Sequence, residues 1–367
     1  MKIAQIAPLI ESCPPRLYGG TERIVSYLTE ELVRQGHDVT LFASGDSRTS
    51  ATLEACSEMA LRLDPAVKDP IPYYVVMMDK VRRMADQFDV LHFHVDVLHY
   101  PLVRDFVERT VTTLHGRLDL QDLRAAFRVF GHLPHVAISD DQRRPTPPMN
   151  WAGVVHHGLP RDLLPFKSNP RGDYLAFLGR ISPEKRPDRA IEIAARAGMK
   201  LKMAAKLDRV DQDYWQNVIA PMVNMHPNVE FVGEINERQK AEFLGEAAAL
   251  LFPIDWPEPF GLVMIESMAC GTPVVAFRRG SAAEVIDDGV SGFLVDSVPE
   301  AVEAVKRIHE VDRAGARACF ERRFGVERMV ADYLTIYHEL PGVRARSLLR
   351  ERARLAERSQ VVPMSRR

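Results

Sequence analysis

The sequence predicts an α/β protein with two doubly wound domains, each built on a parallel sheet. The chain has 367 residues, more than one ordinary hydrophobic core accommodates. A strand, a helix and a second strand follow one another at the N-terminus, and a similar series begins again near residue 174. A proline-rich, polar segment at 161–172 separates the two series and is typical of a linker. Because ligands of such folds bind at the carboxyl ends of the strands, we expect the functional site in the cleft between the domains.

The first series begins with a βαβ unit. Residues 3–7 and 38–43 are apolar runs that predict strands, and 21–35 carries apolar residues at helical spacing between them. Gly36 can end that helix. Strands joined by a helix in this way lie parallel in one sheet. Later apolar runs predict further strands of the same sheet, at 89–94, 110–115, 136–139 and 154–158.

The second series repeats this pattern after the linker. Residues 174–179 and 201–205 predict strands, with a helix at 187–197 between them. Further apolar runs extend the sheet, at 229–233, 248–253 and 274–277. The two halves are therefore of similar size and similar construction.

The composition excludes some classes of protein. A formal net charge of -2 gives no general attraction for nucleic acid. The four cysteines are scattered without a C-x-x-C pair, which favours reduced thiols in a cytosolic protein. The N-terminal segment is too short and too interrupted for a signal peptide, and no apolar run approaches the roughly 18–20 residues that span a bilayer. We expect a cytoplasmic location.

Residues 341–367 differ in composition from the rest of the chain. They hold eight Arg and two Glu, which gives this segment a net charge of +6. The simpler interpretation is a solvated basic tail. The alternative is a weak contact with an anionic membrane surface, which would place the protein at the inner face of the membrane.

Residues 258–277 form the most informative stretch of the sequence. Glu258 and Glu266 lie eight residues apart, one before a short predicted helix and one inside it. Pro259 suits the first turn of that helix, while Gly271 and the proline after it favour its end. The apolar run 274–277 then predicts a buried parallel strand.

The start of this helix predicts a binding site for an anion. We expect the free N–H groups of Phe260, Gly261 and Leu262 to point out of the helix start, where the helix dipole favours negative charge. Glu266, about two turns into the helix, can accept hydrogen bonds from a neutral diol beyond the anion. These features together indicate a pocket for a sugar nucleotide.

The stretch around Glu258 and Glu266 resembles the donor site of retaining glycosyltransferases of family 4, the glycosyl transferases group 1. The E-x7-E spacing, the Glu-Pro-Phe-Gly sequence and the following Gly-Thr-Pro-Val-Val carry the resemblance, which extends over roughly residues 1–340. It implies the GT-B fold, in which two Rossmann-like domains face an interdomain cleft. The resemblance implies an acceptor-side domain at 1–160, a linker at 161–172 and a nucleotide-sugar domain at 173–324. A helix at 325–340 then rejoins the first domain.

Two further segments are similar to the family's phosphate-binding parts. Arg180 and Lys185 match a G-R-x-x-x-x-K segment at the end of a predicted strand, and both side chains suit the oxygens of a diphosphate. Gly20 lies in a Gly-Gly-Thr loop before the first helix, where the family's loop closes over the donor phosphate. The loop after Gly233 contacts the base through backbone atoms in the family, which corresponds to Ile235.

Histidines suggest the remaining contacts. His115 follows a strand, and the resemblance places it near the transferred sugar, where it can donate a hydrogen bond to a hydroxyl. His92 and His94 share one face of a strand, but no third ligand at a convincing spacing accompanies them, so we expect no metal and consider that one of them lines the acceptor side. The acidic pair Asp211 and Asp213 is interpreted as the cap of a helix and not as a metal site.

The resemblance implies a retaining, metal-independent transfer of a hexosyl unit from a nucleoside-diphosphate sugar to an acceptor hydroxyl. Glu258, His115, Arg180 and Lys185 would act at the reacting sugar and diphosphate. No cofactor beyond the sugar nucleotide is expected, and the acceptor can be a glycan, a glycolipid or a small molecule, with polysaccharide biosynthesis as the process. The sequence departs from the family pattern at His157 and in two segments beside the sugar and acceptor pockets, 254–257 and 278–281.

Two alternatives remain open. One is a sugar-nucleotide epimerase or a phosphorylase on the same fold, although no clear marker for either is visible. The other is a non-catalytic nucleotide-sugar-binding protein, which would be expected to lose Glu258 or His115.

Overall fold

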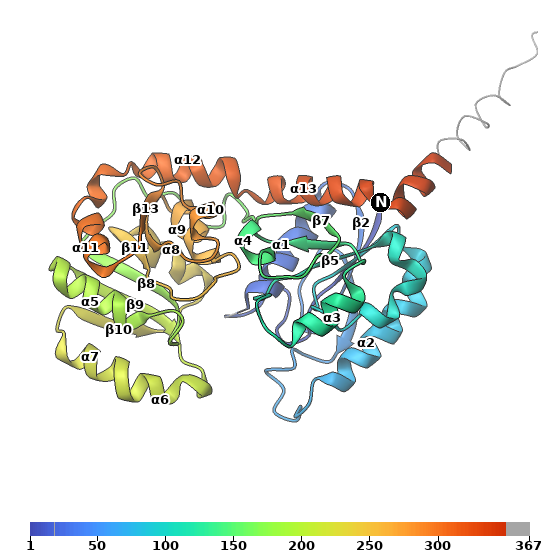
Figure 1. Ribbon diagram of the computed structural model, residues 1–367, viewed down its shortest axis with the longest axis horizontal. Helices are drawn as coiled ribbons and strands as arrows, with labels where there is room; N and C mark the ends of the chain where they lie inside the picture. Colours follow the sequence, from blue (N-terminus) through green and yellow to red (C-terminus); the bar gives the residue numbers. More distant parts are fainter. Residues whose placement is uncertain (18, 350–367) are drawn as a thin grey trace, which may run out of the picture.

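The computed structural model describes residues 1–17 and 19–349, which form two domains side by side (Figure 1). The first domain holds a seven-stranded sheet of order β3-β2-β1-β4-β5-β6-β7, and the second a six-stranded sheet of order β10-β9-β8-β11-β12-β13. All neighbouring strands run parallel. The predicted α/β class with two doubly wound parallel sheets is confirmed.

The strands of the first sheet are β1 (Lys2–Ile6), β2 (Asp38–Ser44), β3 (Thr52–Ser57), β4 (Val90–Phe93), β5 (Thr110–Thr113), β6 (His135–Ala137) and β7 (Trp151–Val154). Those of the second are β8 (Tyr174–Arg180), β9 (Lys200–Lys206), β10 (Val229–Gly233), β11 (Ala249–Phe252), β12 (Val274–Phe277) and β13 (Gly292–Val295). The expected strand at 154–158 is wrong, because β7 ends where that run begins and the following residues lead out of the sheet.

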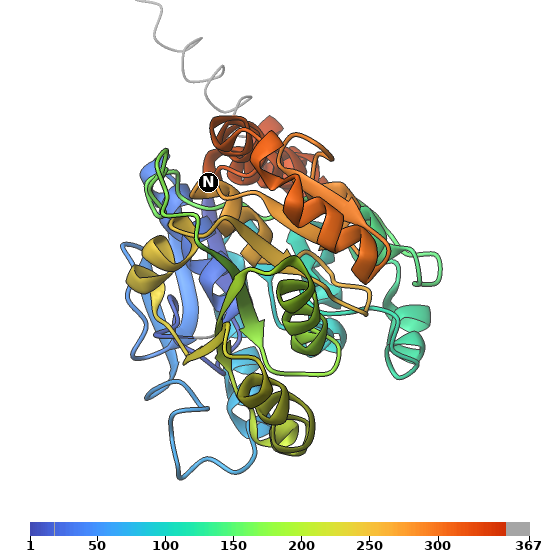
Figure 2. The same ribbon diagram turned by 90° about the vertical axis from the view of Figure 1, so that its left-hand side faces the viewer.

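The helices of the first half are α1 (Gly20–Arg34), α2 (Ile71–Met84), α3 (Leu123–Phe130) and α4 (Asp140–Arg143). Those of the second half are α5 (Pro187–Ala197), α6 (Gln212–Tyr214), α7 (Ala220–Met225), α8 (Glu237–Gly245), α9 (Leu262–Ala269), α10 (Ala282–Val285), α11 (Val298–Lys306), α12 (Arg313–Arg323) and α13 (Val326–Glu339). In the view of Figure 2, which faces the second domain, α5 and α11 lie beside each other over its sheet. No helix in the described ranges is long and apolar enough to cross a bilayer.

Helix α13 leaves the second half of the chain and packs on the first domain (Figure 1). Its Tyr337 hydroxyl accepts a hydrogen bond from Gln5 of β1 at 3.1 Å, and α13 lies against α1. One hydrophobic cluster runs from the first sheet through α13 and α12 to α9 of the second domain. The two domains are therefore joined by packed side chains as well as by the connection between their sheets.

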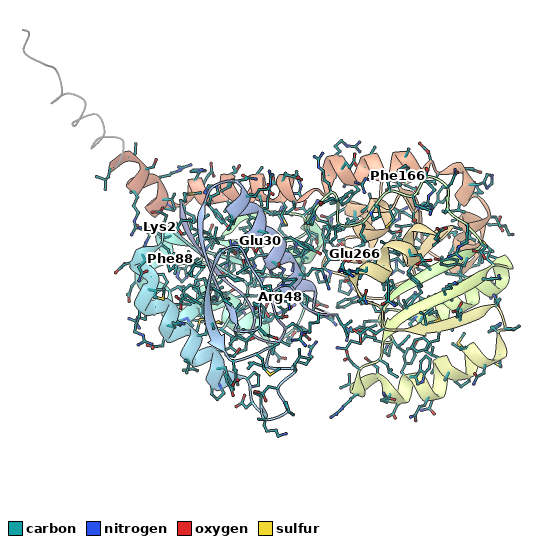
Figure 3. The ribbon with its side chains drawn as sticks, turned by 180° about the vertical axis from the view of Figure 1, so that it is seen from behind. Lys2, Glu30, Arg48, Phe88, Phe166 and Glu266 are labelled. Carbon is teal, nitrogen blue, oxygen red and sulfur yellow. The ribbon has the colours of Figure 1, made fainter. Side chains whose placement is uncertain are left out.

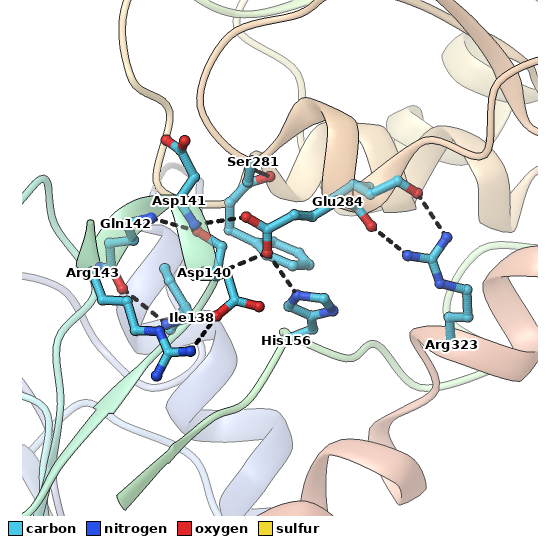
Figure 4. A network of polar contacts seen from close by, with 12 residues as sticks. Ile138, Asp140, Asp141, Gln142, Arg143, His156, Ser281, Glu284 and Arg323 are labelled. Carbon is cyan, nitrogen blue, oxygen red and sulfur yellow. Dashed lines mark hydrogen bonds and ion pairs between the residues drawn. The ribbon is translucent and has the colours of Figure 1, made fainter. Parts of the chain in front are cut away.

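A polar network also links the domains at one side of the cleft (Figure 4). The Glu284 carboxylate of α10 accepts hydrogen bonds from the backbone N–H groups of Asp140 and Asp141, at 2.8 and 2.7 Å, and lies 3.3 Å from His156 Nε2. Burial opposes ionisation of Glu284, but the hydrogen bonds from His156 and the two N–H groups outweigh it and lower the pKa of this carboxyl group. Ser139 adds a bond from its hydroxyl to the Pro259 carbonyl at 2.7 Å.

Candidate active site

A cavity of about 590 Å³ lies between the domains and brings the predicted site residues together. Its wall includes every residue that the sequence singled out for the donor site: Gly20, His115, Arg180, Lys185, Ile235, Glu258, Phe260, Gly261, Leu262 and Glu266. Figure 3 shows Glu266 in the region where the two domains face each other. The carboxyl ends of β8 and β9 contribute to the same wall, as expected for a doubly wound fold.

Glu258 is held by two neighbours in the cavity wall. Its carboxylate forms an ion pair with Lys185, and it accepts a hydrogen bond from Trp256 Nε1 at 2.8 Å. The Lys185 ammonium also lies 4.8 Å from the centre of the Trp256 ring. Lys185, which the sequence assigned to the diphosphate, is therefore neutralised by Glu258.

The loop that carries Glu258 rests on a tight turn at Gly280. A Cβ atom at Gly280 would collide with backbone atoms of Glu258, and Gly280 has a φ of +54°. Ser281, the next residue, donates its N–H to the Glu258 carbonyl at 3.0 Å and its hydroxyl to the Phe260 carbonyl at 2.7 Å. In the sequence this turn is visible only as a departure from the family pattern, yet it fixes the backbone of residues 258–261, the acidic loop.

Helix α9 begins at Leu262 and not at Pro259. Gly261 has φ 80° and ψ 69°, a left-handed conformation that turns the chain sharply into the helix. The expectation that Pro259 lies in the first turn is therefore wrong, and Glu266 lies about one turn into the helix, not two. The helix start that lines the cavity is formed by Leu262 and Val263, whose N–H groups precede the intrahelical bonding pattern.

Glu266 is buried and already has a cationic partner. Lys240 of α8 lies 2.7 Å from one oxygen of its carboxylate. Lys240 also lies 3.5 Å from Glu237, which pairs with Arg23 of α1 across the cleft. Sequence reasoning missed these three residues because no local motif marks a contact between segments so far apart in the chain.

Arg180 stands at the end of β8 beside two acidic groups. Its guanidinium lies 2.9 Å from Glu184 and 3.8 Å from Asp208. Lys206, at the end of the neighbouring strand β9, also lines the cavity and lies 3.0 Å from Asp208. Several cations therefore gather at the strand ends, as the sequence predicted for Arg180 and Lys185.

His115 lies at the cavity wall within a group of aromatic rings. Its Nε2 lies 2.8 Å from His94 Nδ1, and its ring stacks on His157 with centroids 5.3 Å apart. Burial lowers the pKa of His115 to about 3, so the ring is neutral near pH 7. His157 is buried and in turn packs edge-on against Phe260.

His92 and His94 belong to the interior of the first domain and not to the acceptor side of the cavity. His92 lies 2.7 Å from both the Tyr337 hydroxyl and the Thr113 hydroxyl, and His94 lies 2.8 Å from the Gln5 side-chain oxygen. Neither of the two lines the cavity. The suggestion that one of them faces the acceptor is wrong, because the polar groups of the core bind both rings.

The first domain contributes a second group of charges that the sequence did not indicate. Glu11 lies 2.9 Å from Arg62, and the two side chains line the cavity together with Glu22. Burial raises the pKa of Glu22 to about 7. Gly20 lies close enough to α9 that a Cβ atom there would stand 3.6 Å from the Leu262 side chain.

Ile235 is buried beside the end of β10. The next residue, Asn236, caps α8 by accepting a hydrogen bond from the Gln239 N–H at 3.2 Å, and the Asn236 N–H donates to the Gln239 side-chain oxygen at 2.9 Å. This capping box fixes the backbone around Ile235, where the resemblance implies contact with a base.

Family models match both halves of the chain. A model described as Glycosyltransferase Family 4 matches residues 18–136, and one described as Glycosyl transferases group 1 matches residues 162–314. The second match contains the acidic loop, α9 and the strand-end cations.

The chain belongs to the family 4 glycosyltransferases.

Curated relatives in this family include two bacterial proteins described as D-inositol 3-phosphate glycosyltransferase. The protein from Geodermatophilus obscurus is 31% identical over 195 residues, which are 47% of this chain and 43% of the relative. The protein from Acidothermus cellulolyticus is 25% identical over 345 residues, which are 76% of this chain and 75% of the relative. The first match thus covers less than half of the relative's own length.

Solved structures of glycosyltransferases share the GT-B fold of this family 4 chain. A structure of AviGT4, described as a glycosyltransferase involved in avilamycin A biosynthesis, superposes with a TM-score of 0.73 at 21% identity, covering 93% of this chain and 98% of that one. Anabaena HepE in complex with UDP and glucose superposes with a TM-score of 0.71 at 19% identity, covering 91% and 98%. The predicted GT-B architecture is confirmed.

The Asp211–Asp213 pair of this glycosyltransferase lies at the start of the short helix α6. Asp211 occupies the N-cap position, but its side chain makes no capping hydrogen bond, so the expected capping contact is wrong in its detail. Over the described ranges, no group of three His, Cys, Asp or Glu side chains is arranged to hold a metal ion.

Proposed function

We propose that this protein transfers a hexosyl unit from a nucleoside-diphosphate sugar to an acceptor hydroxyl, with retention at the anomeric carbon and without a metal ion. The observation that carries the proposal is the meeting of Glu258, Glu266, Arg180 and Lys185 in one interdomain cavity beside the start of α9. A diphosphate, a ribose and a sugar each find groups of suitable chemistry there. The relatives and the solved neighbours support a sugar-nucleotide donor, since HepE structures are described with UDP and with UDP-glucose.

Glu266 would bind the ribose. Lys240 holds one of its carboxylate oxygens at 2.7 Å, which leaves the other oxygen able to accept hydrogen bonds from hydroxyl groups. Ile235 and the capped start of α8 would lie beside the base. Gly20 would let the first domain approach the donor phosphate closely.

Arg180, Lys185 and the first turn of α9 would stabilise the diphosphate as it departs. Lys185 pairs with Glu258, so the diphosphate and Glu258 would share its ammonium group. Glu258 and His115 would hold the hexosyl group between them. These cations supply the neutralisation that a divalent metal supplies in other glycosyltransferases.

The transfer itself would take place on one face of the sugar. The bond between the anomeric carbon and the diphosphate oxygen breaks, and the acceptor oxygen forms the new bond from the same side. The leaving phosphate oxygen takes the proton of the acceptor hydroxyl, so the products are the glycoside and the protonated nucleoside diphosphate. No side chain of the protein needs to form a covalent intermediate.

The remaining expectations belong to this proposal as well. The acceptor would be a glycan, a glycolipid or a small molecule. The process would be polysaccharide biosynthesis, and the protein would be located in the cytoplasm. Contact of the basic tail with a membrane concerns residues 341–367, of which 350–367 lie outside the described part of the chain.

The test is a transfer assay with UDP-, GDP- and ADP-sugars against a panel of acceptors, followed by NMR of the product. We expect one donor class to be consumed, the product to keep the donor's anomeric configuration, and EDTA to leave the rate unchanged. Inversion or a requirement for Mg²⁺ or Mn²⁺ would refute the corresponding part. Conversion of one sugar nucleotide into another without an acceptor would indicate an epimerase. Phosphate-dependent cleavage of a glycan would indicate a phosphorylase, and binding without turnover would indicate a binding protein.

A further inference from the structure

Four charged side chains of alternating sign cross the cleft from the first domain to the candidate ribose carboxylate. Arg23 of α1 pairs with Glu237 at the start of α8, Glu237 lies 3.5 Å from Lys240, and Lys240 lies 2.7 Å from Glu266 of α9. Glu266, Arg23 and Lys240 are largely shielded from water, with side-chain exposures of 4, 7 and 14%. Charges in such surroundings interact more strongly than charges on an open surface.

Arg23 is fixed by partners on both sides. One guanidinium nitrogen binds Glu237, and the other donates to the Leu17 carbonyl at 2.7 Å, in the loop that precedes Gly19 and Gly20. Burial is the largest influence and would lower the pKa of Arg23, but the Glu237 carboxylate together with Tyr27 and Glu266 outweighs it, and the pKa is raised. Arg23 therefore connects the glycine loop of the first domain to the second domain through a single side chain.

Lys240 stands between two carboxylates and can be drawn to either. Glu237 lies one helical turn before it on α8, and Glu266 lies on the neighbouring helix. When Arg23 neutralises Glu237, the ammonium group of Lys240 remains with Glu266. Without Arg23, Glu237 would compete for Lys240, and the Glu266 carboxylate would lose the partner that fixes its orientation.

We propose that Arg23 is a positioning residue for the donor ribose, acting through Glu237 and Lys240 to hold the Glu266 carboxylate in its accepting orientation. This inference rests on the proposed function of Glu266. It adds that the ribose subsite, built from the second domain, is completed by a residue of the first domain.

The experiment compares ribose recognition in the parent protein and in Arg23→Gln. Calorimetric titration measures the affinities of UDP, GDP and ADP and of their 2′,3′-dideoxy counterparts, and the ratio of the two affinities for the preferred base reports the ribose contact. We expect the parent to favour the ribonucleotide, and Arg23→Gln to reduce that preference by about tenfold, the scale of one hydrogen bond to a charged group. Affinity for the dideoxynucleotide should change much less.

Three further variants separate positioning from general stability. Arg34→Gln removes the pair between an exposed arginine and Glu31 on the same helix, away from the cavity, and should leave the ratio unchanged. Arg23→Lys should restore part of the preference for the ribonucleotide. The double variant Arg23→Gln/Glu237→Gln should lose no more of that preference than Arg23→Gln alone, because an uncharged side chain at position 237 does not compete for Lys240.

The outcomes distinguish this inference from the proposed function. An unchanged ribose preference in a folded Arg23→Gln protein would overturn the inference and leave the proposed donor site intact. A parent protein that binds none of the three nucleotides would overturn the proposed function, and the inference with it.

Discussion

Glu258 has two partners from different segments, the Lys185 ammonium and the Trp256 indole N–H. A carboxylate held in this way has a fixed position before any substrate arrives, which is the condition for stabilising charge at a reacting centre. Its partner Lys185 is also a candidate for the diphosphate. The group proposed to act on the sugar and the group proposed to bind the diphosphate therefore form one ion pair at the cavity wall.

We expect Glu258→Gln to lower kcat by about 100-fold while the Kd for the donor changes by less than about threefold. The substitution keeps the size of the side chain and removes the charge that would act on the sugar. Donor affinity by calorimetry and initial rates of transfer check this expectation. Glu303→Gln, on an exposed pair with Lys306, serves as the control. A variant that loses donor binding and keeps its turnover would contradict the role of Glu258.

Glu22 gives the stability of the protein a dependence on pH. Burial raises its pKa in the folded chain from an ordinary 4.5 to about 7, so the folded state holds this proton more tightly than the unfolded state does. The contribution of this protonated group to the free energy of unfolding is fully present below about pH 4.5 and is lost as the pH rises to about 7. We expect Glu22→Gln to abolish this loss, which amounts to at most about 3 kcal/mol. Urea denaturation of both proteins at pH 5 and pH 8 measures it; equal losses in the two proteins would show that Glu22 is not responsible.

At the scale of elements, the acidic loop 258–261 depends on the turn that supports it. Gly280 lies directly against the backbone of Glu258, and Ser281 binds the carbonyl groups on both sides of Pro259. The position of Glu258 is therefore set by a segment that carries no reactive group itself.

We expect Gly280→Ala to lower the rate of transfer by at least about tenfold, since the added methyl group must displace the Glu258 backbone. Gly289→Ala is a matched control, because Gly289 also has a positive φ, +77°, yet nothing lies within 4 Å of a Cβ atom there. Both variants bear similar backbone strain, of the order of 1 kcal/mol. Equal activities of the two variants would argue against support of the acidic loop by Gly280.

Helices α4 and α10 form a second contact across the cleft. The Glu284 carboxylate receives the N–H groups of Asp140 and Asp141 at the start of α4. We expect Glu284→Ala to open the cleft more often and to weaken donor binding by about three- to tenfold, because binding then has to favour closure without these bonds. Small-angle scattering with and without nucleotide, together with calorimetry, tests this; unchanged scattering and affinity would show that other contacts keep the cleft closed.

Apolar periodicity was sufficient to predict most strands and the parallel arrangement, because strands such as β8 and β12 are nearly continuous apolar runs. It missed β3, an edge strand that is only half buried, and β13, which has four residues with glycine first. The start of α9 was placed too early because Pro259 resembles an N-terminal helix residue, whereas the left-handed Gly261 sets the true start. Local sequence contains both signals, but only the folded chain decides between them.

The residues of the candidate site also fall into those that local sequence predicts and those that only the folded chain reveals. Residues in recurring motifs, such as Glu258, Glu266 and Arg180, could be named from the sequence. Arg23 and Lys240 could not, because their importance lies in pairs formed between separate helices. His157, which lines the cavity, and the turn at Gly280 are visible in the sequence only as departures from the family pattern.

On the scale of the whole molecule, the two domains face each other across a cavity to which both contribute, and α13 ties the end of the chain back to the first domain (Figure 1). Packed side chains, the Glu284 network and the Arg23–Glu237 pair all connect the domains. A ligand that fills the cavity therefore touches both domains and should stabilise the molecule as a unit.

The most direct measurement is thermal unfolding of the parent protein and of Glu266→Gln with UDP, GDP, ADP and their common sugars, in the presence and absence of EDTA. At a ligand concentration about 100 times its Kd, binding to the folded state contributes about 2.7 kcal/mol. We predict that one nucleotide class raises the Tm of the parent by several degrees, that EDTA does not alter this increase, and that Glu266→Gln strongly reduces it. The absence of any increase in the parent protein would contradict the donor site and, with it, the proposed sugar-nucleotide chemistry.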